Sequence, residues 1–362
     1  MDFTKAKKAF LVLADGTVFE GKSFGAEGTA MGEVVFTTAM VGYQETLTDP
    51  CYQGQMVVQT FPLIGNYGTN DEDYASDNSV VSGYIVREYC EEPSNFRCTS
   101  TIDAFMKKHG IIGLYDIDTR CLTRIIREKG VMNGMITVTD SLDREDAVAK
   151  IASFDAGAVA ANASVKENKL LKADNAKYNV ALIDFGDYKA YATELVKRGC
   201  NVTVMPYDTS AEAVKAISPD GVFLSDGPGN PDVNTKSIET IKNLISDKIP
   251  MFGVGLGHLE LAAANGAEIV KLKYGHRGAS QPVLTFETGR TYITTQNHGY
   301  AVESISTDVA EMTHINGNDK TCEGIKYNNI PAFSVQFRPE TCGGPQDTSY
   351  LYDRFIKMME DK

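Results

Sequence analysis

A turn between a strand and a helix carries the first pattern in this sequence that could do chemistry. Residues 252–258 read Phe-Gly-Val-Gly-Leu-Gly-His, with an apolar strand pattern before them and a helical pattern at 259–265 after them. Glycines two before and two after a central residue indicate a nucleophile elbow, which presents a Ser or Cys side chain. The central residue here is Gly255, which has no side chain to present. A nucleotide-phosphate turn is an alternative, but the G-x-G-x-x-G spacing fails.

A second strand pattern ends in a base–Pro–acid arrangement whose first residue, at position 338, is not a base that can take up a proton. Residues 333–337 are followed by Arg338, Pro339 and Glu340. A histidine at position 338, oriented by Glu340, could take a proton from a nucleophile. The Arg338 guanidinium stays protonated at physiological pH and cannot do so. Taken alone, Arg338 and Glu340 are more often an ordinary surface pair at a strand end.

A glycine-containing loop is the third place where a ligand could bind. Residues 225–231 read Ser-Asp-Gly-Pro-Gly-Asn-Pro and follow a strand pattern. Gly227 and Gly229 leave backbone N–H groups free to face an oxyanion or a carboxylate. Taken alone, the loop is better explained as a tight turn between a strand and a helix.

The elements that position these three places alternate between strands and helices from residue 179 onward. Short apolar runs are typical of parallel strands that are buried on both faces, and they occur at 180–183, 202–204, 221–224 and 249–254. Helical patterns lie between them, one of them at 211–217. The pattern predicts an open, mostly parallel α/β sheet with its site at the carboxyl ends of the strands.

The first part of the chain is β-rich and ends in two helical patterns. Strand patterns occur at 11–13, 17–19, 33–36 and 80–86, and helical spacing occurs at 102–109 and 118–129, the latter capped by Asp118 or Thr119. Residues 153–177 are rich in Ala, Asn and Lys and lack strong periodicity. We therefore predict an N-terminal domain at 1–152, a connection at 153–177 and a second domain at 178–362.

Composition excludes several classes of protein. The chain has 362 residues, 43% hydrophobic and 23% charged, with a formal net charge of −13. This charge argues against a nucleic acid or an anionic membrane as the main partner. No segment is predicted to be a signal peptide or to span a bilayer, which predicts a cytoplasmic protein. The seven cysteines and five histidines are scattered, so their spacing predicts reduced thiols and no metal-ligand cluster.

Short motifs in the first half of the chain are specific in their order and spacing, at residues 32–36, 42–45, 47–50, 65–68, 94–97 and 116–120. On these motifs the chain resembles the small subunit family of carbamoyl-phosphate synthase, and the resemblance extends over essentially its whole length. The second half resembles class I (triad-type) glutamine amidotransferases at residues 184–186, 227–229, 273–276 and 296–300. The resemblance implies an N-terminal, β-rich α/β small-subunit domain, followed by the open sheet of that amidotransferase type.

The resemblance also implies a function and a partner. The family's small subunit hydrolyses glutamine and delivers ammonia to a large subunit, which makes carbamoyl phosphate for arginine or pyrimidine supply. A large-subunit partner in a hetero-oligomer is therefore expected. No cofactor is expected in this chain, because ATP, magnesium and bicarbonate belong to the large subunit.

The sequence departs from the family where the chemistry should occur. The family has its nucleophilic cysteine at the position of Gly255 and its histidine base at the position of Arg338, so only Glu340 remains of the triad. A glutamine-contacting Gln is replaced by Leu259, and a Ser that reaches the pocket from the first domain is replaced by Cys51. Without the thiolate and the imidazole, we predict that the glutaminase step is lost.

The remaining positions of the family's pocket could still hold a small ligand weakly. The resemblance assigns binding to Cys51, Gly227, Gly229, the Leu256 amide, Leu259, Asn297, Gly299 and Tyr300. Glutamine binding is accordingly expected to be weak or absent, and the chain is predicted to be an ammonia-dependent or regulatory partner subunit.

Two alternatives to this function stay open at the level of sequence. One is an active glutaminase whose nucleophile has moved to Cys51 or Cys342, with His258 or His298 as base, or an engineered inactive copy. The other is a free-standing sensor that binds an amino acid in the former pocket.

Overall fold

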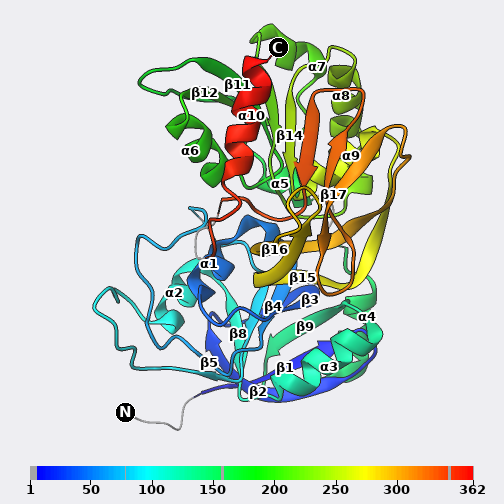
Figure 1. Ribbon diagram of the computed structural model, residues 1–362. Coiled ribbons are helices and arrows are strands. Elements are labelled where there is room, and N and C mark those ends of the chain that lie inside the picture. The colour runs from blue at the N-terminus through cyan, green and yellow to red at the C-terminus, as the bar shows by residue number, and fades with distance from the viewer. Residues whose placement is uncertain (1–5, 78, 156–158, 341–343, 362) are drawn as a thin grey trace. The chain divides into compact units, whose positions relative to one another are not determined.

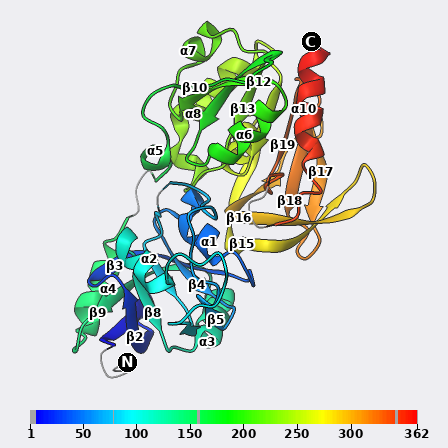
Figure 2. The same ribbon diagram turned by 90° about the vertical axis from the view of Figure 1, so that its left-hand side faces the viewer.

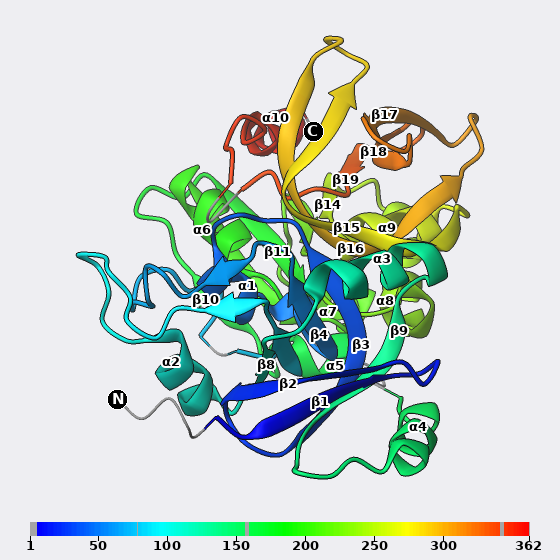
Figure 3. The same cartoon turned by 90° about the horizontal axis from the view of Figure 1, so that it is seen from below.

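Seven strands form a closed barrel in the first half of the chain (Figure 3). Their order around the barrel is β1-β2-β8-β6-β4-β3-β9, so strands distant in sequence are neighbours. Buried residues of β2, β3, β4, β6 and helix α2 share one hydrophobic cluster, and residues of β1 and β9 join α4 in another. The barrel strands are β1 (Lys8–Leu13), β2 (Val18–Gly25), β3 (Thr29–Thr37), β4 (Gln55–Gln59), β6 (Gly83–Ile85), β8 (Ile112–Tyr115) and β9 (Met132–Val138).

The two helices that the sequence predicted in this first part, α2 and α3, begin within one residue of their predicted starts, whereas α1 and α4 were not predicted. The side chain of Thr101 caps α2 by accepting from the Ala104 amide, and that of Asp118 caps α3 by accepting from the Cys121 amide. The remaining elements of this part are α1 (Tyr43–Thr48), the 3-10 turn η1 (Pro50–Tyr52), the paired β5 (Leu63–Ile64) and β7 (Glu88–Tyr89), α2 (Ile102–His109), α3 (Thr119–Lys129) and α4 (Arg144–Ala152).

A ten-stranded sheet forms the second part of the chain, in the order β10-β12-β11-β13-β14-β19-β18-β17-β15-β16. The central strands β12, β11, β13, β14 and β19 pair in parallel, and the strands on both sides pair antiparallel. Their bounds are β10 (Lys169–Leu171), β11 (Tyr178–Asp184), β12 (Cys200–Pro206), β13 (Gly221–Leu224), β14 (Met251–Val254), β15 (Glu268–Thr285), β16 (Thr291–Ser304), β17 (Ala310–Asn316), β18 (Cys322–Tyr327) and β19 (Ala332–Val335).

Helices cover both faces of this sheet (Figures 1 and 2). Side chains of α6 and α10 pack with Phe223 and Phe252 on one face, and side chains of α7, α8 and α9 pack with Leu224 and Met251 on the other. The alternation of adjacent residues between the two clusters is the expected pleat of a strand buried on both sides. The helices are α5 (Val159–Ala163), α6 (Lys189–Lys197), α7 (Ala211–Ala216), the 3-10 turn η2 (Pro231–Val233), α8 (Thr235–Ile245), α9 (Leu256–Ala264) and α10 (Tyr350–Glu360).

The computed structural model describes residues 6–77, 79–155, 159–340 and 344–361 and divides into two units, Met1–Gly157 and Ala158–Lys362. The predicted class is confirmed: the chain is mixed α/β, with a parallel sheet core in its second unit. The segment predicted as a connection, 153–177, contains α5 and also β10, which pairs with β12. No helix among the described residues is long and apolar enough to cross a membrane.

Candidate functional site

Four neighbouring parallel strands bring the chemically suggestive residues to one edge of the sheet. Strands β11, β13, β14 and β19 are adjacent in that order. Their carboxyl ends lead to Asp187, Asp226, Gly255 and Arg338, respectively. Ligand sites of open α/β sheets lie at this edge. The structure therefore places Gly255 and Arg338 where the sequence predicted, and it adds two acidic residues that the sequence did not single out.

The elbow between β14 and α9 keeps the backbone of a nucleophile turn. Gly255 has φ 56° and ψ −113°, a conformation that a residue with a side chain rarely adopts. The flanking glycines allow the close approach of strand and helix: a Cβ on Gly253 would lie 2.7 Å from the Gly257 carbonyl oxygen, and one on Gly257 would lie 2.4 Å from that of Leu224. The turn is built as an elbow although its central side chain is absent.

The carboxylate of Asp226 occupies the space that a nucleophile would need. A Cβ on Gly255 would lie 2.0 Å from Asp226 Oδ1, far inside any van der Waals contact. The same oxygen accepts hydrogen bonds from the Leu256 amide at 2.9 Å and from the Gly227 amide at 2.8 Å. These are two of the amides that the sequence suggested as a cradle for a substrate oxygen. In this chain the cradle holds a carboxylate of the protein itself.

Arg338 holds this carboxylate in place. Its Nε donates to Asp226 Oδ2 at 3.1 Å, and its terminal nitrogen lies 3.4 Å from Asp187 Oδ2. The side chains of Arg338, Asp187 and Asp226 are 12%, 9% and 4% exposed. A charge-assisted pair with so little exposure has strong directional hydrogen bonds and little screening by solvent. The position that would hold the base holds instead a fixed cation facing two carboxylates.

Glu340 is buried beside Tyr352, whose hydroxyl donates to Glu340 Oε2 at 2.9 Å. Burial raises the pKa of Glu340 well above its usual range, against the attraction of Arg338. The acid of a triad orients and stabilises an imidazolium. With Arg338 at the base position, the retained Glu340 has no imidazole to orient.

The other predicted binding residues are divided between the two units. Leu259 is 3% exposed and belongs to a hydrophobic cluster that also contains Leu224 and Leu256. Gly229 has φ 107°, and a Cβ there would meet the Val159 side chain at 2.7 Å. Three more predicted residues, Asn297, Gly299 and Tyr300, lie together in β16. Cys51 lies in the first unit, in η1, and is buried.

The histidines and thiols of the second unit are poorly suited to replace the lost groups. His258 is fully buried, its Nδ1 lies 2.7 Å from Ser334 Oγ, and burial lowers its pKa to about 3. Burial also lowers the pKa of His298 well below its usual range. Burial raises the pKa of the Cys200 thiol to about 11 and that of Cys322 to about 12. A reactive cysteine requires the opposite shift. Cys342 lies outside the described residues.

Helix α9, which carries the elbow, is anchored by a buried carboxyl. Glu260 is fully buried; its Oε1 accepts from Asn234 Nδ2 at 2.7 Å, and its Oε2 accepts from the Ser237 hydroxyl. Burial raises the pKa of Glu260 to about 8 from an ordinary value of 4.5. The group is therefore protonated at neutral pH in the folded chain but ionised in the unfolded chain. The stability that it contributes is full below pH 4.5 and is lost as the pH rises toward 8.

Replacing Glu260 by glutamine should remove this dependence on pH. The Glu260→Gln amide can keep hydrogen bonds of similar shape but does not titrate. As the pH rises from 5 to 8, the parent should lose roughly 3–4 kcal/mol more of its free energy of unfolding than the variant does. Urea unfolding across this range measures the difference. Parallel pH profiles for the two proteins would show that Glu260 does not titrate as described.

Sequence reasoning missed Asp226 and Asp187 as residues of the site. Asp226 lies in the glycine loop that the sequence indicated, but its side chain was not assigned a role. An acidic residue beside a loop that could hold an anion was the one available signal, because a carboxylate is itself an anion that the loop's amides can bind.

Comparisons with known proteins agree with the resemblance. Residues 11–136 match the CPSase domain of the carbamoyl-phosphate synthase small chain, and residues 181–358 match class I glutamine amidotransferase. A carbamoyl phosphate synthase small chain of Clostridium perfringens is 47% identical, covering 97% of this chain and 99% of that protein. The corresponding chain of Archaeoglobus fulgidus is 45% identical, with 98% of this chain and 99% of that one covered. A pyrimidine-specific small chain of Bacillus subtilis is 45% identical, with 98% of this chain and 96% of that one covered.

Proposed function

The chain belongs to the carbamoyl phosphate synthase small-chain family, and we propose that it serves there as a partner subunit that does not hydrolyse glutamine. It binds a large subunit that uses free ammonia, and it stabilises or regulates that subunit. The observation that carries the proposal is the Asp226 carboxylate, which fills the nucleophile's space at Gly255 and the amide cradle beside it.

The nucleophile, the free oxyanion donor and the base that amide hydrolysis requires are all lacking in this site. Gly255 provides no thiolate to form a covalent intermediate. The Leu256 amide, which would stabilise the oxyanion, already donates to Asp226. Arg338 cannot accept a proton, and it is held by Asp226 and Asp187. Losses of this kind in one pocket reduce the rate by orders of magnitude.

The same arrangement supports weak or absent glutamine binding. A ligand that reached the Gly227 and Leu256 amides would have to displace the Asp226 carboxylate and break its pair with Arg338. The burial of His258, Cys200 and Cys322 argues against a relocated active site in the second unit. An amino-acid sensor that uses the former pocket is also disfavoured, because its ligand would have to displace the Asp226 carboxylate from the same amides.

Carbamoyl phosphate synthesis by the chain with its large subunit tests the proposal. We expect synthesis with ammonium chloride as nitrogen donor, and less than about a hundredth of that rate with glutamine, because the glutaminase step is missing. Glutamate release is measured in the same reactions. The large subunit alone is the control, since a change in its ammonia-dependent rate or thermal stability on adding this chain measures the partner role. Glutamine-dependent synthesis with equimolar glutamate release would refute the proposal.

A further inference from the structure

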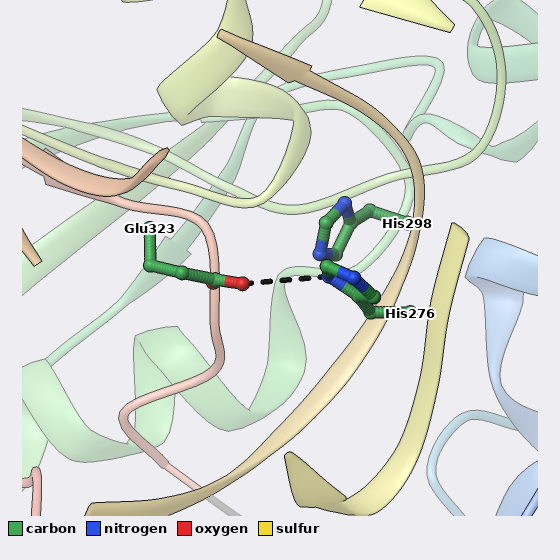
Figure 4. A group of neighbouring side chains, drawn as sticks. All are labelled: His276, His298 and Glu323. Carbon is green, nitrogen blue, oxygen red and sulfur yellow. Dashed lines mark ion pairs between the residues drawn. The ribbon is translucent and has the colours of Figure 1, made fainter. Parts of the chain in front are cut away.

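A second group of polar side chains converges between β15, β16 and β18. His276 on β15, His298 on β16 and Glu323 on β18 each offer one ligand atom, and these atoms lie within 4.8 Å of one another. The residues are 6%, 8% and 0% exposed. Figure 4 shows the two imidazole rings beside one another, with the carboxylate directed toward them. Sequence spacing did not indicate this group, because the fold alone brings the three strands together.

The outward nitrogen of each imidazole has an acceptor that fixes its proton. His276 Nε2 lies 2.8 Å from Asp319 Oδ2, and His298 Nδ1 lies 2.8 Å from the Tyr300 carbonyl oxygen. A carboxylate and a backbone carbonyl are the partners that metal-binding histidines use to orient their rings. With the N–H groups directed outward, His276 Nδ1 and His298 Nε2 present lone pairs to the interior of the group.

These inward lone pairs face oxygen atoms that also carry lone pairs. His276 Nδ1 lies 3.4 Å from Glu323 Oε1, and His298 Nε2 lies 3.1 Å from Gln296 Oε1. The Gln296 amide is oriented by its own Nε2, which donates to Glu323 Oε2 at 3.0 Å and to Thr294 Oγ1 at 3.1 Å. A neutral His298 has one N–H for two acceptors. A cation among these atoms would satisfy the nitrogen and the oxygen together.

The separation between one imidazole nitrogen and the carboxylate matches that of two ligands of one metal ion. Atoms bound about 2.1 Å from a tetrahedral zinc ion lie about 3.4 Å apart, which is the distance between His276 Nδ1 and Glu323 Oε1. We propose that His276, His298 and Glu323 bind one divalent transition-metal ion. Zinc suits two imidazoles and a carboxylate. Gln296 Oε1 or a water molecule completes the site.

The competing explanation is a metal-free network with a charged His276. In that case His276 carries two protons and lies between the carboxylates of Asp319 and Glu323. Asn316 Nδ2 also donates to Glu323 Oε1 at 2.9 Å and lies 3.4 Å from His276 Nδ1. The two explanations differ in an observable way, because a doubly protonated His276 has no lone pair for a metal ion, whereas the neutral ring has one on Nδ1.

The role of such an ion would be structural. Its ligands are buried, so substrates have no access, and they link three strands of the antiparallel part of the sheet. The ion would hold the β16 segment that contains Asn297, Gly299 and Tyr300 against β18. The site is independent of the proposed loss of glutamine hydrolysis, because none of its ligands is at Gly255 or Arg338.

Metal content and stability of the full chain test the proposal. After removal of metal by a chelator, zinc titration should show one tight equivalent per chain. Saturating zinc should raise the midpoint of thermal unfolding by about 5 °C. The variants His298→Gln and Glu323→Gln should lose both effects, whereas His109→Gln, which removes a histidine of the first unit, should keep them. Absence of a tight equivalent, or binding that is unchanged in His298→Gln and Glu323→Gln, would overturn the proposal.

Cobalt(II) substitution keeps the test decisive if the variants do not fold. The parent chain with one equivalent of cobalt should show the visible absorption of a four-coordinate site with nitrogen and oxygen ligands. Intense near-ultraviolet bands from thiolate ligands would assign the ion to the cysteines and would contradict the proposal. The spectrum of a hexa-aquo cobalt ion would also contradict the proposal, because it would show that the chain does not bind the ion and that the metal-free network is the native state.

Discussion

Glutamine hydrolysis should appear in this chain only when Asp226 is removed and three of the departures from the family, at positions 255, 259 and 338, are reversed. The variant that combines Asp226→Ala with Gly255→Cys, Leu259→Gln and Arg338→His is expected to release glutamate from glutamine. We expect a rate about 10³ times that of the parent, part of the roughly 10⁶ that an intact triad contributes. The assay is glutamate release by the purified chain with its large subunit.

The requirement for the fourth replacement follows from the geometry of the elbow. A Cβ at position 255 would lie 2.0 Å from Asp226 Oδ1, and the thiol introduced by Gly255→Cys would need still more of that space. The Asp226 carboxylate would also remain on the Leu256 and Gly227 amides, where the oxyanion must bind. In addition, Arg338→His removes the cation that Asp226 pairs with. The triple variant that keeps Asp226 should therefore stay inactive.

The control replaces the nucleophile and nothing else. In the fourfold variant, Gly255→Ala in place of Gly255→Cys supplies the Cβ without the thiol, and its rate should fall to that of the parent. A triple variant that retains Asp226 and is as active as the fourfold variant would show that this carboxylate does not block the site. Inactivity of the fourfold variant, with a folded chain, would show that the surrounding pocket has also changed.

Much of the core of the second unit could be predicted from the residues themselves. The run Gly221–Leu224 is continuous and apolar, and it forms β13 with the same bounds as predicted. The helix at 102–109 in the first unit was predicted with equal accuracy, because an N-cap threonine and a C-cap glycine mark its two ends. In both cases the signal is local, so the sequence contains it in a few consecutive residues.

The antiparallel half of the sheet could not be predicted in the same way. Strand β15 extends over Glu268–Thr285 and pairs with β16 through several irregularities in register. Bulges interrupt the alternation of buried and exposed residues on which strand prediction depends. Closure of the barrel in the first unit depends likewise on pairing between strands far apart in sequence, such as β2 with β8.

The site shows the same division between local and distant information. The absence of a nucleophile at Gly255 and of a base at Arg338 could be deduced from single positions within recognisable motifs. The contact between Asp226 and Arg338 joins residues 112 positions apart. The sequence therefore predicted which groups are missing but not that a carboxylate replaces them in the cradle. That replacement turns an empty pocket into an occupied one.

The ion pair between Arg338 and Asp226 should be among the larger contributions of a single contact to the stability of the second unit. Replacing Arg338 by methionine would remove the cation that contacts the Asp226 and Asp187 carboxylates, which are 4% and 9% exposed. We expect Arg338→Met to reduce the free energy of unfolding by about 3–5 kcal/mol, the usual cost of removing one partner of a buried ion pair. Urea unfolding followed by circular dichroism at pH 7 measures the loss.

Replacing a more exposed arginine of the same unit serves as a control that separates the effect of burial from the loss of a positive charge. Arg354 pairs with Glu287, but the two side chains are 34% and 62% exposed, so Arg354→Met should cost less than about 1 kcal/mol. Combining Arg338→Met with Asp226→Asn should recover most of the loss, because the amide no longer needs a cation while it can still accept from the Leu256 amide. If Arg338→Met and Arg354→Met were equally mild, the Arg338 pair would be solvated, and a ligand could displace Asp226 from the cradle at little cost. A large loss that Asp226→Asn reverses would instead show that the occupied cradle is a stable part of the fold.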